Sequence, residues 1–192
     1  MDIGEVHVPS VLESLSTSKV LTLSTLLYIF ILLTLFIHSF IHSGLKYHYK
    51  SINLLKGEQS HPDFLHLNPV GFVPVLVDGD SVIFDSFAII MYLEDKYPQH
   101  PLLPTDIHKR AINFQAVSIV SSSIQPLHNL NLLKYIEINV GPDEKLPWVQ
   151  SVIRKGFTAL EKLLKEHTGR YATGDEVCMV CCKSLEFVCL KL

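Results

Sequence analysis

The stretch NPVGFVPVLVDGDSVIFDSFAIIMYLEDKY, residues 68–97, decides the fold, because a hairpin and a helix start follow one another within it. Its first half predicts a short apolar strand, and Asp78-Gly79 is a pair typical of tight hairpin turns. A return strand follows, and Asp85-Ser86 then opens a helix with apolar residues at helical spacing. The order is therefore turn, strand, hairpin, strand and helix start.

Two positions in this stretch are suited to holding a ligand. Val73-Pro74 precedes the first strand, at the one type of peptide bond where the cis form costs little. At Asp85-Ser86 the unpaired N–H groups of a helix start favour an anion such as a carboxylate, and Ser86 adds a hydroxyl. The alternative role of Ser86 is that of a plain helix N-cap.

Composition excludes several classes of function. The chain has 192 residues and a formal net charge of −3, which gives no electrostatic footprint for nucleic acid. The sequence contains no glycine-rich phosphate loop, no GxSxG elbow and no HExxH zinc motif. No catalytic triad can be argued from the spacing of its residues.

All four cysteines lie in the final fifteen residues, as Cys178, Cys181, Cys182 and Cys189. A disulfide framework would place cysteines throughout the fold, so we expect free thiols in a reducing compartment. A zinc site is the alternative, but the Cys-x-x-Cys pair lacks a second pair of ligands. The spacing of His38, His42 and His48 also completes no ligand set, and no metal site is predicted.

Residues 20–45 contain no formally charged residue, and their core reads LTLSTLLYIFILLTLFI. A run of about 20 apolar residues is long enough to cross a bilayer as a helix. We therefore expect an apolar helix over residues 20–41, with a membrane anchor and a buried core segment as its two interpretations. The lysines after the run would place its C-terminal side in the cytosol.

Further along, the pattern changes from α/β to all-α. The proline-rich segment PQHPLLPT, residues 98–105, predicts an extended linker between the two parts. The part before it shows only three strands and two helices, so the sheet is expected to be incomplete and to have an uncovered edge. The predicted strand covers residues 45–55, and the predicted helices cover residues 62–67, 106–123, 127–140 and 146–167.

Several motifs in the right order resemble the zeta class of soluble glutathione transferases, which includes maleylacetoacetate isomerase. The hairpin stretch resembles the N-terminal domain of these enzymes, and Ile52-Asn53-Leu54-Leu55-Lys56-Gly57 is similar to the plant version. The helical part adds Ile124-Gln125-Pro126-Leu127 and Gly156-Phe157. The resemblance covers roughly residues 44–177.

This resemblance implies a fold of α/β plus all-α class, with an incomplete thioredoxin-like domain, a truncated helical domain and an N-terminal hydrophobic helix. The expected parts are a divergent segment 1–44, a thioredoxin-like part 45–97, the linker 98–105, a helical part 106–177 and a divergent tail 178–192. The family is normally a cytoplasmic homodimer. Its members bind glutathione and isomerise maleylacetoacetate in tyrosine breakdown.

By the same resemblance, glutathione is bound by residues from both parts of the chain. The residue before the cis-proline lends its main chain to the cysteinyl part, and the acidic residue and serine at the helix start hold the γ-glutamyl part. The implied glutathione-binding residues are Gln59, Val73, Pro74, Asp85, Ser86, Gln125, Asn129 and Leu130.

The catalytic motif of the family, Ser-Ser-Cys, occurs nowhere in this sequence, and Ser121-Ser122-Ser123 lies in the helical part. No catalytic residue is therefore assigned, and we expect an enzyme with weak or no isomerase activity. Two other hypotheses stay open: a non-catalytic protein tethered to a membrane by residues 20–41, and an interaction module that pairs its open sheet edge with another chain.

Overall fold

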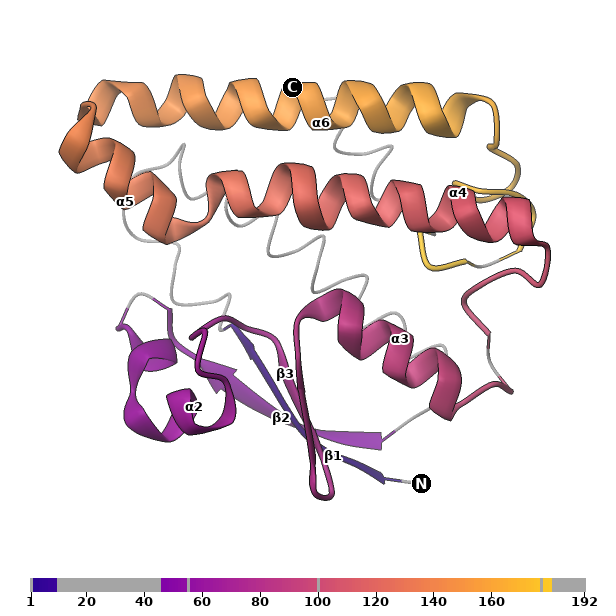
Figure 1. Ribbon diagram of the computed structural model, residues 1–192, viewed down its shortest axis with the longest axis horizontal. Helices are drawn as coiled ribbons and strands as arrows, with labels where there is room; N and C mark the ends of the chain where they lie inside the picture. The colour runs from indigo at the N-terminus through magenta and orange to yellow at the C-terminus, as the bar shows by residue number, and fades with distance from the viewer. Residues whose placement is uncertain (1, 10–45, 55, 100, 177, 181–192) are drawn as a thin grey trace. The chain divides into compact units, whose positions relative to one another are not determined.

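The computed structural model describes the chain except for residues 1, 10–45, 55, 100, 177 and 181–192. It consists of two compact units, Met1–Pro101 and Leu102–Leu192 (Figure 1). Their boundary falls within the segment predicted to be a linker. Leu102 and Leu103 are nonetheless buried, and the Leu102 carbonyl accepts a hydrogen bond from the Met179 N–H.

The first unit contains a four-stranded sheet in the order β2-β1-β3-β4. Its strands are β1 (Asp2–Pro9), β2 (Lys46–Ile52), β3 (Val75–Asp78) and β4 (Ser81–Phe84). β1 runs parallel to β2 and antiparallel to β3, and β3 and β4 form the predicted hairpin. This sheet, with helices against both faces, is the thioredoxin-like domain that the sequence implies.

The expectation of a three-stranded, incomplete sheet is wrong. Residues 2–9, expected to be part of the divergent segment 1–44, form one of the two inner strands. The physical reason is main-chain pairing, because β2 and β3 each present N–H and C=O groups that a strand between them satisfies. The interaction-module hypothesis assumed that one strand of the sheet is missing, and the sheet contains that strand.

Successive side chains of β3 point to opposite faces of the sheet and pack in the core on each face. Leu76 faces α3 (Ser86–Lys96) and packs with Ile89 and Leu93. Val75 points to the opposite face, where it packs with Ile52 of β2 and with Phe64 of α2 (Pro62–Leu67). Successive side chains of a strand point to opposite sides, so one short strand joins two helices.

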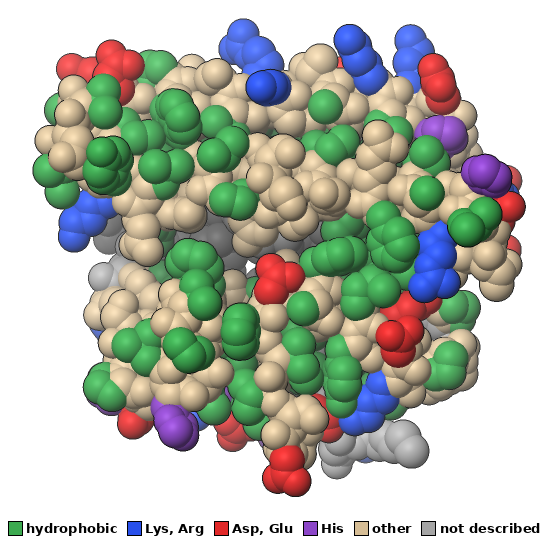
Figure 2. Space-filling view, viewed as in Figure 1, with side chains coloured by type: hydrophobic (Ala, Val, Ile, Leu, Met, Phe, Trp, Pro, Cys, Tyr) green, Lys and Arg blue, Asp and Glu red, His purple; other side chains and the backbone are tan. Residues whose placement is uncertain are grey.

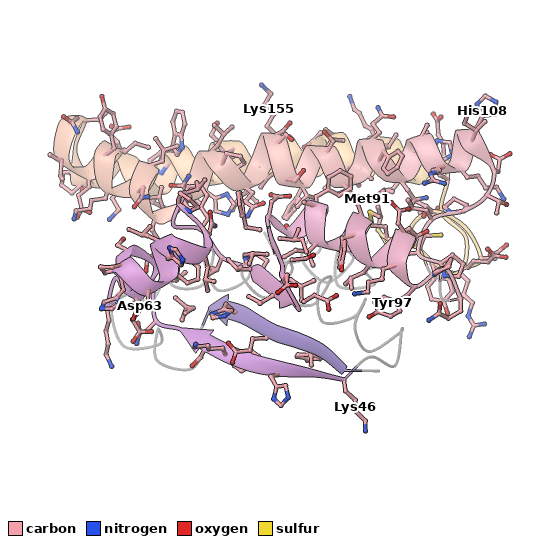
Figure 3. The ribbon with its side chains drawn as sticks, turned by 60° about the horizontal axis from the view of Figure 1, so that its bottom comes forward. Lys46, Asp63, Met91, Tyr97, His108 and Lys155 are labelled. Carbon is pink, nitrogen blue, oxygen red and sulfur yellow. The ribbon has the colours of Figure 1, made fainter. Side chains whose placement is uncertain are left out.

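The second unit is helical, as predicted. Its main elements are α4 (Ile107–Ser118), a π-helical segment η3 (Ile119–Ile124), a 3-10 turn η4 (Gln125–His128), α5 (Leu130–Asn139), a 3-10 turn η5 (Pro142–Glu144) and α6 (Lys145–Lys165). The helix predicted over residues 106–123 is thus regular only to Ser118. Lysine side chains line the exposed face of α6, where Lys155 points outward (Figures 2 and 3).

None of the described helices is both long and apolar enough to cross a membrane. The predicted apolar helix over residues 20–41 lies outside the described residues. So does most of the tail 178–192, apart from the buried residues Cys178, Met179 and Val180.

His7 is a buried titratable residue in the strand that the sequence did not reveal. Its side chain is 2% exposed and its ring meets the Phe64 ring edge-on, with the centroids 6.1 Å apart. Burial lowers the pKa of His7, and the Lys50 ammonium lowers it further. The Glu5 carboxylate, 3.5 Å from Nε2, raises the pKa but does not reverse the shift.

This lowered pKa predicts that acid weakens the fold. As the pH falls through 6.5, the ordinary value for histidine, the unfolded chain takes up a proton on residue 7 that the folded chain resists. The free energy of unfolding should therefore decrease with falling pH, and less steeply in His7→Phe, which keeps a ring against Phe64. Urea unfolding at a series of pH values measures this. His48→Phe, at an exposed position of β2, controls for the loss of one histidine, and an unchanged slope in His7→Phe would contradict the assignment.

Candidate functional site

The loop before β3 is shaped by one buried side chain, Asn68. Its Nδ2 donates to the Phe72 carbonyl at 2.7 Å, and its Oδ1 accepts from the Val70 N–H at 3.0 Å. Its main-chain carbonyl also accepts from the Gly71 N–H. These three bonds hold the loop that leads into the Val73-Pro74 peptide bond, which is cis as the sequence suggested.

Gln59 lies against the same loop. A Cβ added at Gly71, which has a φ of 70°, would stand 3.2 Å from the Gln59 main-chain oxygen, so only glycine allows this close approach without displacement. Among the described residues, no hydrogen bond reaches the buried Oε1 of Gln59. A buried amide oxygen without a donor is a position where a ligand N–H or a water is expected.

Asp85 begins α3 in an unusual conformation. Its φ is 78°, and it is the one described residue other than glycine with a positive φ. Its Oδ1 accepts from the N–H groups of Phe87 and Ala88, both at 3.0 Å. Asp85 is therefore the N-cap, and the alternative assignment of that role to Ser86 is wrong. Ser86 is the first helical residue, 5% exposed.

The hairpin brings these two places together. Val75 pairs with Phe84 across the β3–β4 ladder. Pro74 comes directly before Val75 and Asp85 directly after Phe84, so the cis-proline turn and the start of α3 lie at the same end of the hairpin. One edge of the first unit thus holds four of the predicted residues: Val73, Pro74, Asp85 and Ser86.

At the other end of the hairpin lies a charged contact that sequence reasoning missed. The Lys96 ammonium hydrogen-bonds to Asp78, and the Tyr92 hydroxyl donates to the same carboxylate oxygen at 2.9 Å. The hydrogen bond from Lys96 is the main reason that the pKa of Asp78 is lowered, and that from Tyr92 adds to it. The contact ties α3 to the hairpin turn.

The remaining predicted residues lie in the second unit. Gln125 is half-buried in the 3-10 turn η4, and Asn129 caps α5 by accepting from the Leu132 N–H at 2.9 Å. Leu130 is the first residue of α5. Within the described residues, no group of His, Cys, Asp and Glu side chains has the arrangement of a metal site.

Comparison with known proteins identifies the family that this chain resembles. Residues 26–95 match the family model described as "Glutathione S-transferase, N-terminal domain". A zeta-class glutathione transferase of Euphorbia esula is 68% identical over 134 residues, which cover 70% of this chain and 60% of that protein. The matched part of this chain is similar to zeta-class glutathione transferases.

More distant relatives and solved structures show the same similarity to zeta-class enzymes. The maleylacetoacetate isomerase of Dictyostelium discoideum is 43% identical over 139 residues, which cover 71% of this chain and 64% of that protein. A holo structure of maleyl pyruvate isomerase, a bacterial zeta-class enzyme, has a TM-score of 0.76 at 28% identity, covering 92% of this chain and 76% of that one. A maleylacetoacetate isomerase of Anaeromyxobacter dehalogenans, solved with glutathione bound, has a TM-score of 0.69 at 26% identity over 92% of this chain and 74% of that one.

The chain spans about three fifths of the length of the plant relatives it matches. The family model starts at residue 26, which is inside the apolar run and upstream of the expected start near residue 44. Residues 26–45 of that run are therefore matched by the glutathione transferase domain.

The Asp85 cap yields a stability prediction. Asp85→Ala removes the acceptor of two helix N–H groups and leaves a β-carbon at positive φ, so the free energy of unfolding should fall by about 1–2 kcal/mol. Asp85→Asn keeps Oδ1 and tolerates this conformation, so it should lose much less. Urea unfolding compares them, and equal losses in the two variants would show that charge, not capping, stabilises this turn.

Proposed function

We propose that this chain is a glutathione-binding protein of the zeta class, in which glutathione lies at the cis-proline end of the hairpin. The observation that carries this is the shared edge of Val73, Asp85 and Ser86. The γ-glutamyl end of glutathione carries an ammonium and a carboxylate, which suit an exposed aspartate and the N–H groups of a helix start.

Each residue has a distinct role in this proposal. The Asp85 cap uses only Oδ1, so Oδ2 is the oxygen that meets the ligand ammonium. Ser86 directs its hydroxyl and N–H to the γ-glutamyl carboxylate, and the Val73 main chain pairs with the cysteinyl unit as a strand edge would. Gln59 uses its buried amide oxygen for a ligand N–H. Gln125, Asn129 and Leu130 remain predicted contacts from the helical unit.

Glutathione binding is tested by isothermal titration calorimetry. Ser86→Ala should weaken binding by roughly tenfold to a hundredfold, the worth of one hydrogen bond to a charged group. Ser81→Ala, at an exposed position on the other end of β4, is the matched control and should bind as the wild type does. If the wild-type chain gives no heat with millimolar glutathione, or if both serine variants bind equally well, the proposed site is wrong.

Family chemistry requires an activated glutathione thiolate. In maleylacetoacetate isomerisation the sulfur adds to the double bond, the resulting single bond rotates, and the sulfur leaves. A hydroxyl or thiol donor beside the sulfur lowers its pKa and makes the thiolate available. Because Ser-Ser-Cys is absent from this sequence, we propose that the chain binds glutathione but activates it poorly.

The expected consequence is a slow enzyme. A purified 192-residue chain should isomerise maleylacetoacetate at least about 100-fold more slowly than an intact zeta-class enzyme, because one positioned proton-handling group is commonly worth that much. The reaction can be followed by the change in ultraviolet absorption, with an intact enzyme assayed in parallel. Equal rates at saturating glutathione would show that another residue activates the sulfur.

The apolar run enters the same proposal as part of the domain. Its support is the family-model match, which spans residues 26–95. Of the two interpretations of the run, a membrane anchor and a buried core segment, this match favours the buried core segment. Cytoplasmic location and a homodimer are what the family implies, and both stay predictions for this chain.

A further inference from the structure

The main chain of Val73, the residue before the cis proline, is unpaired. Among the residues that the structure describes, none donates to its carbonyl or accepts from its N–H. The β3–β4 ladder ends at the pair Val75 and Phe84, and the positive φ of Asp85 then turns the chain into α3. β4 therefore offers Val73 no partner, and an unpaired main chain beside a strand end is a place where an extended peptide can add.

The side chain of Val73, by contrast, is held by the fold. It packs against the cluster of Ile52, Phe64 and Val75 on the α2 face of the sheet. The side chain thus anchors the residue, and the main chain is the part that a ligand can use. How that main chain is presented depends on the loop of residues 69–72, which comes directly before it.

Asn68 fixes this loop from the end of α2. Its own N–H donates to the Phe64 carbonyl at 2.9 Å, which anchors it to the helix. Its Nδ2 donates to the carbonyl of Phe72, the residue directly before Val73, at 2.7 Å. Asn68 is 1% exposed, so it can influence a ligand only through the loop that it holds.

The middle of the loop is held as well. The Val70 N–H donates to Asn68 Oδ1 at 3.0 Å, so one side chain bonds the loop at two places. Gly71, with its φ of 70°, lies against the main chain of Gln59. The loop is therefore bound to α2 through Asn68 and fitted to its neighbour at Gly71, and both contacts lie within the first unit.

We propose that Asn68 is a positioning residue for glutathione, which holds the Phe72 carbonyl and so sets the Val73 main chain for pairing with the cysteinyl unit. This inference rests on the proposed glutathione-binding function and adds a buried residue that itself touches no ligand. The alternative is a structural role alone, in which the two side-chain bonds stabilise the loop and leave affinity unchanged.

The first test removes the Asn68 donor in two ways, with affinity measured by isothermal titration calorimetry. Asn68→Ala should weaken glutathione binding roughly threefold to tenfold, as expected for one hydrogen bond. Asn68→Asp keeps the size of the side chain and an acceptor for Val70 but removes the donor to Phe72, and it should also weaken binding. Asn131→Ala, at an exposed position of α5, is the control and should bind as the wild type does.

A matched pair of glycines separates the loop from general stability. Gly71→Ala and Gly79→Ala both place a β-carbon at positive φ, of 70° and 60° respectively, so both variants should lose stability. Only Gly71 lies in the loop, whereas nothing stands within 4 Å of a Cβ added at Gly79 in the hairpin turn. Gly71→Ala should weaken glutathione binding, and Gly79→Ala should leave it unchanged.

A double-mutant cycle tests whether Asn68 acts through the loop. In a Gly71→Ala background, Asn68→Ala should cost less affinity than it does in the wild type, because both substitutions disturb the same loop. In a Ser86→Ala background it should cost as much as in the wild type, since Ser86 is proposed to meet the other end of the ligand.

Three results would overturn the inference: unchanged affinity in Asn68→Ala, unchanged affinity in Asn68→Asp, or equal affinity in the two glycine variants. If Asn68→Ala does not fold, Asn68→Asp and the glycine pair still decide. If Ser86→Ala weakens binding in those cases, the proposed function stands and only the role of Asn68 fails. If the wild-type chain binds no glutathione, the proposed function fails, and the role of Asn68 fails with it.

Discussion

The burial of β3 on both faces is the constraint on which the first unit depends. Val75 and Leu76 are both fully buried, and they point in opposite directions. One therefore secures α2 and the other α3, while the strand itself pairs with β1 and β4. Removing either side chain would leave a cavity beneath a helix, which commonly costs about 2–5 kcal/mol for a large aliphatic residue. Few positions in a small domain connect four elements in this way.

The same strand determines where a ligand can be held. Its first residue pairs with the last residue of β4, so the cis-proline turn before β3 and the Asp85 cap after β4 share one edge. Asn68 shapes the loop on one side, and the positive φ of Asp85 turns the chain into α3 on the other. A residue held in a sparsely populated conformation beside a helix start marks a place where the surrounding fold maintains strain, as binding sites often do.

In the second unit, order at the predicted site comes from side chains that bond to main-chain carbonyls. The helix that starts at Ile107 does not continue regularly, because its π-helical segment and Pro126 break the ladder. His128, Asn129 and Trp148 replace the lost bonds. The residues matched to the family therefore include some that hold the turn, and the distinction between holding and binding is visible only in their hydrogen bonds.

Local signals in the sequence determined the hairpin, the helix that follows it, the helical second half and the zeta-class motifs, because turn pairs and apolar spacing act over a few residues. The tertiary structure decided what depends on distant partners. Asp2–Pro9 is a strand because β2 and β3 offer it hydrogen bonds on both sides, which its own polar composition does not indicate. Asp85, not Ser86, caps α3, since its side chain accepts from the N–H groups of Phe87 and Ala88. The turn at Gln125 packs against α6 because Gly156, thirty-one residues later, lets that helix approach Ile124 closely.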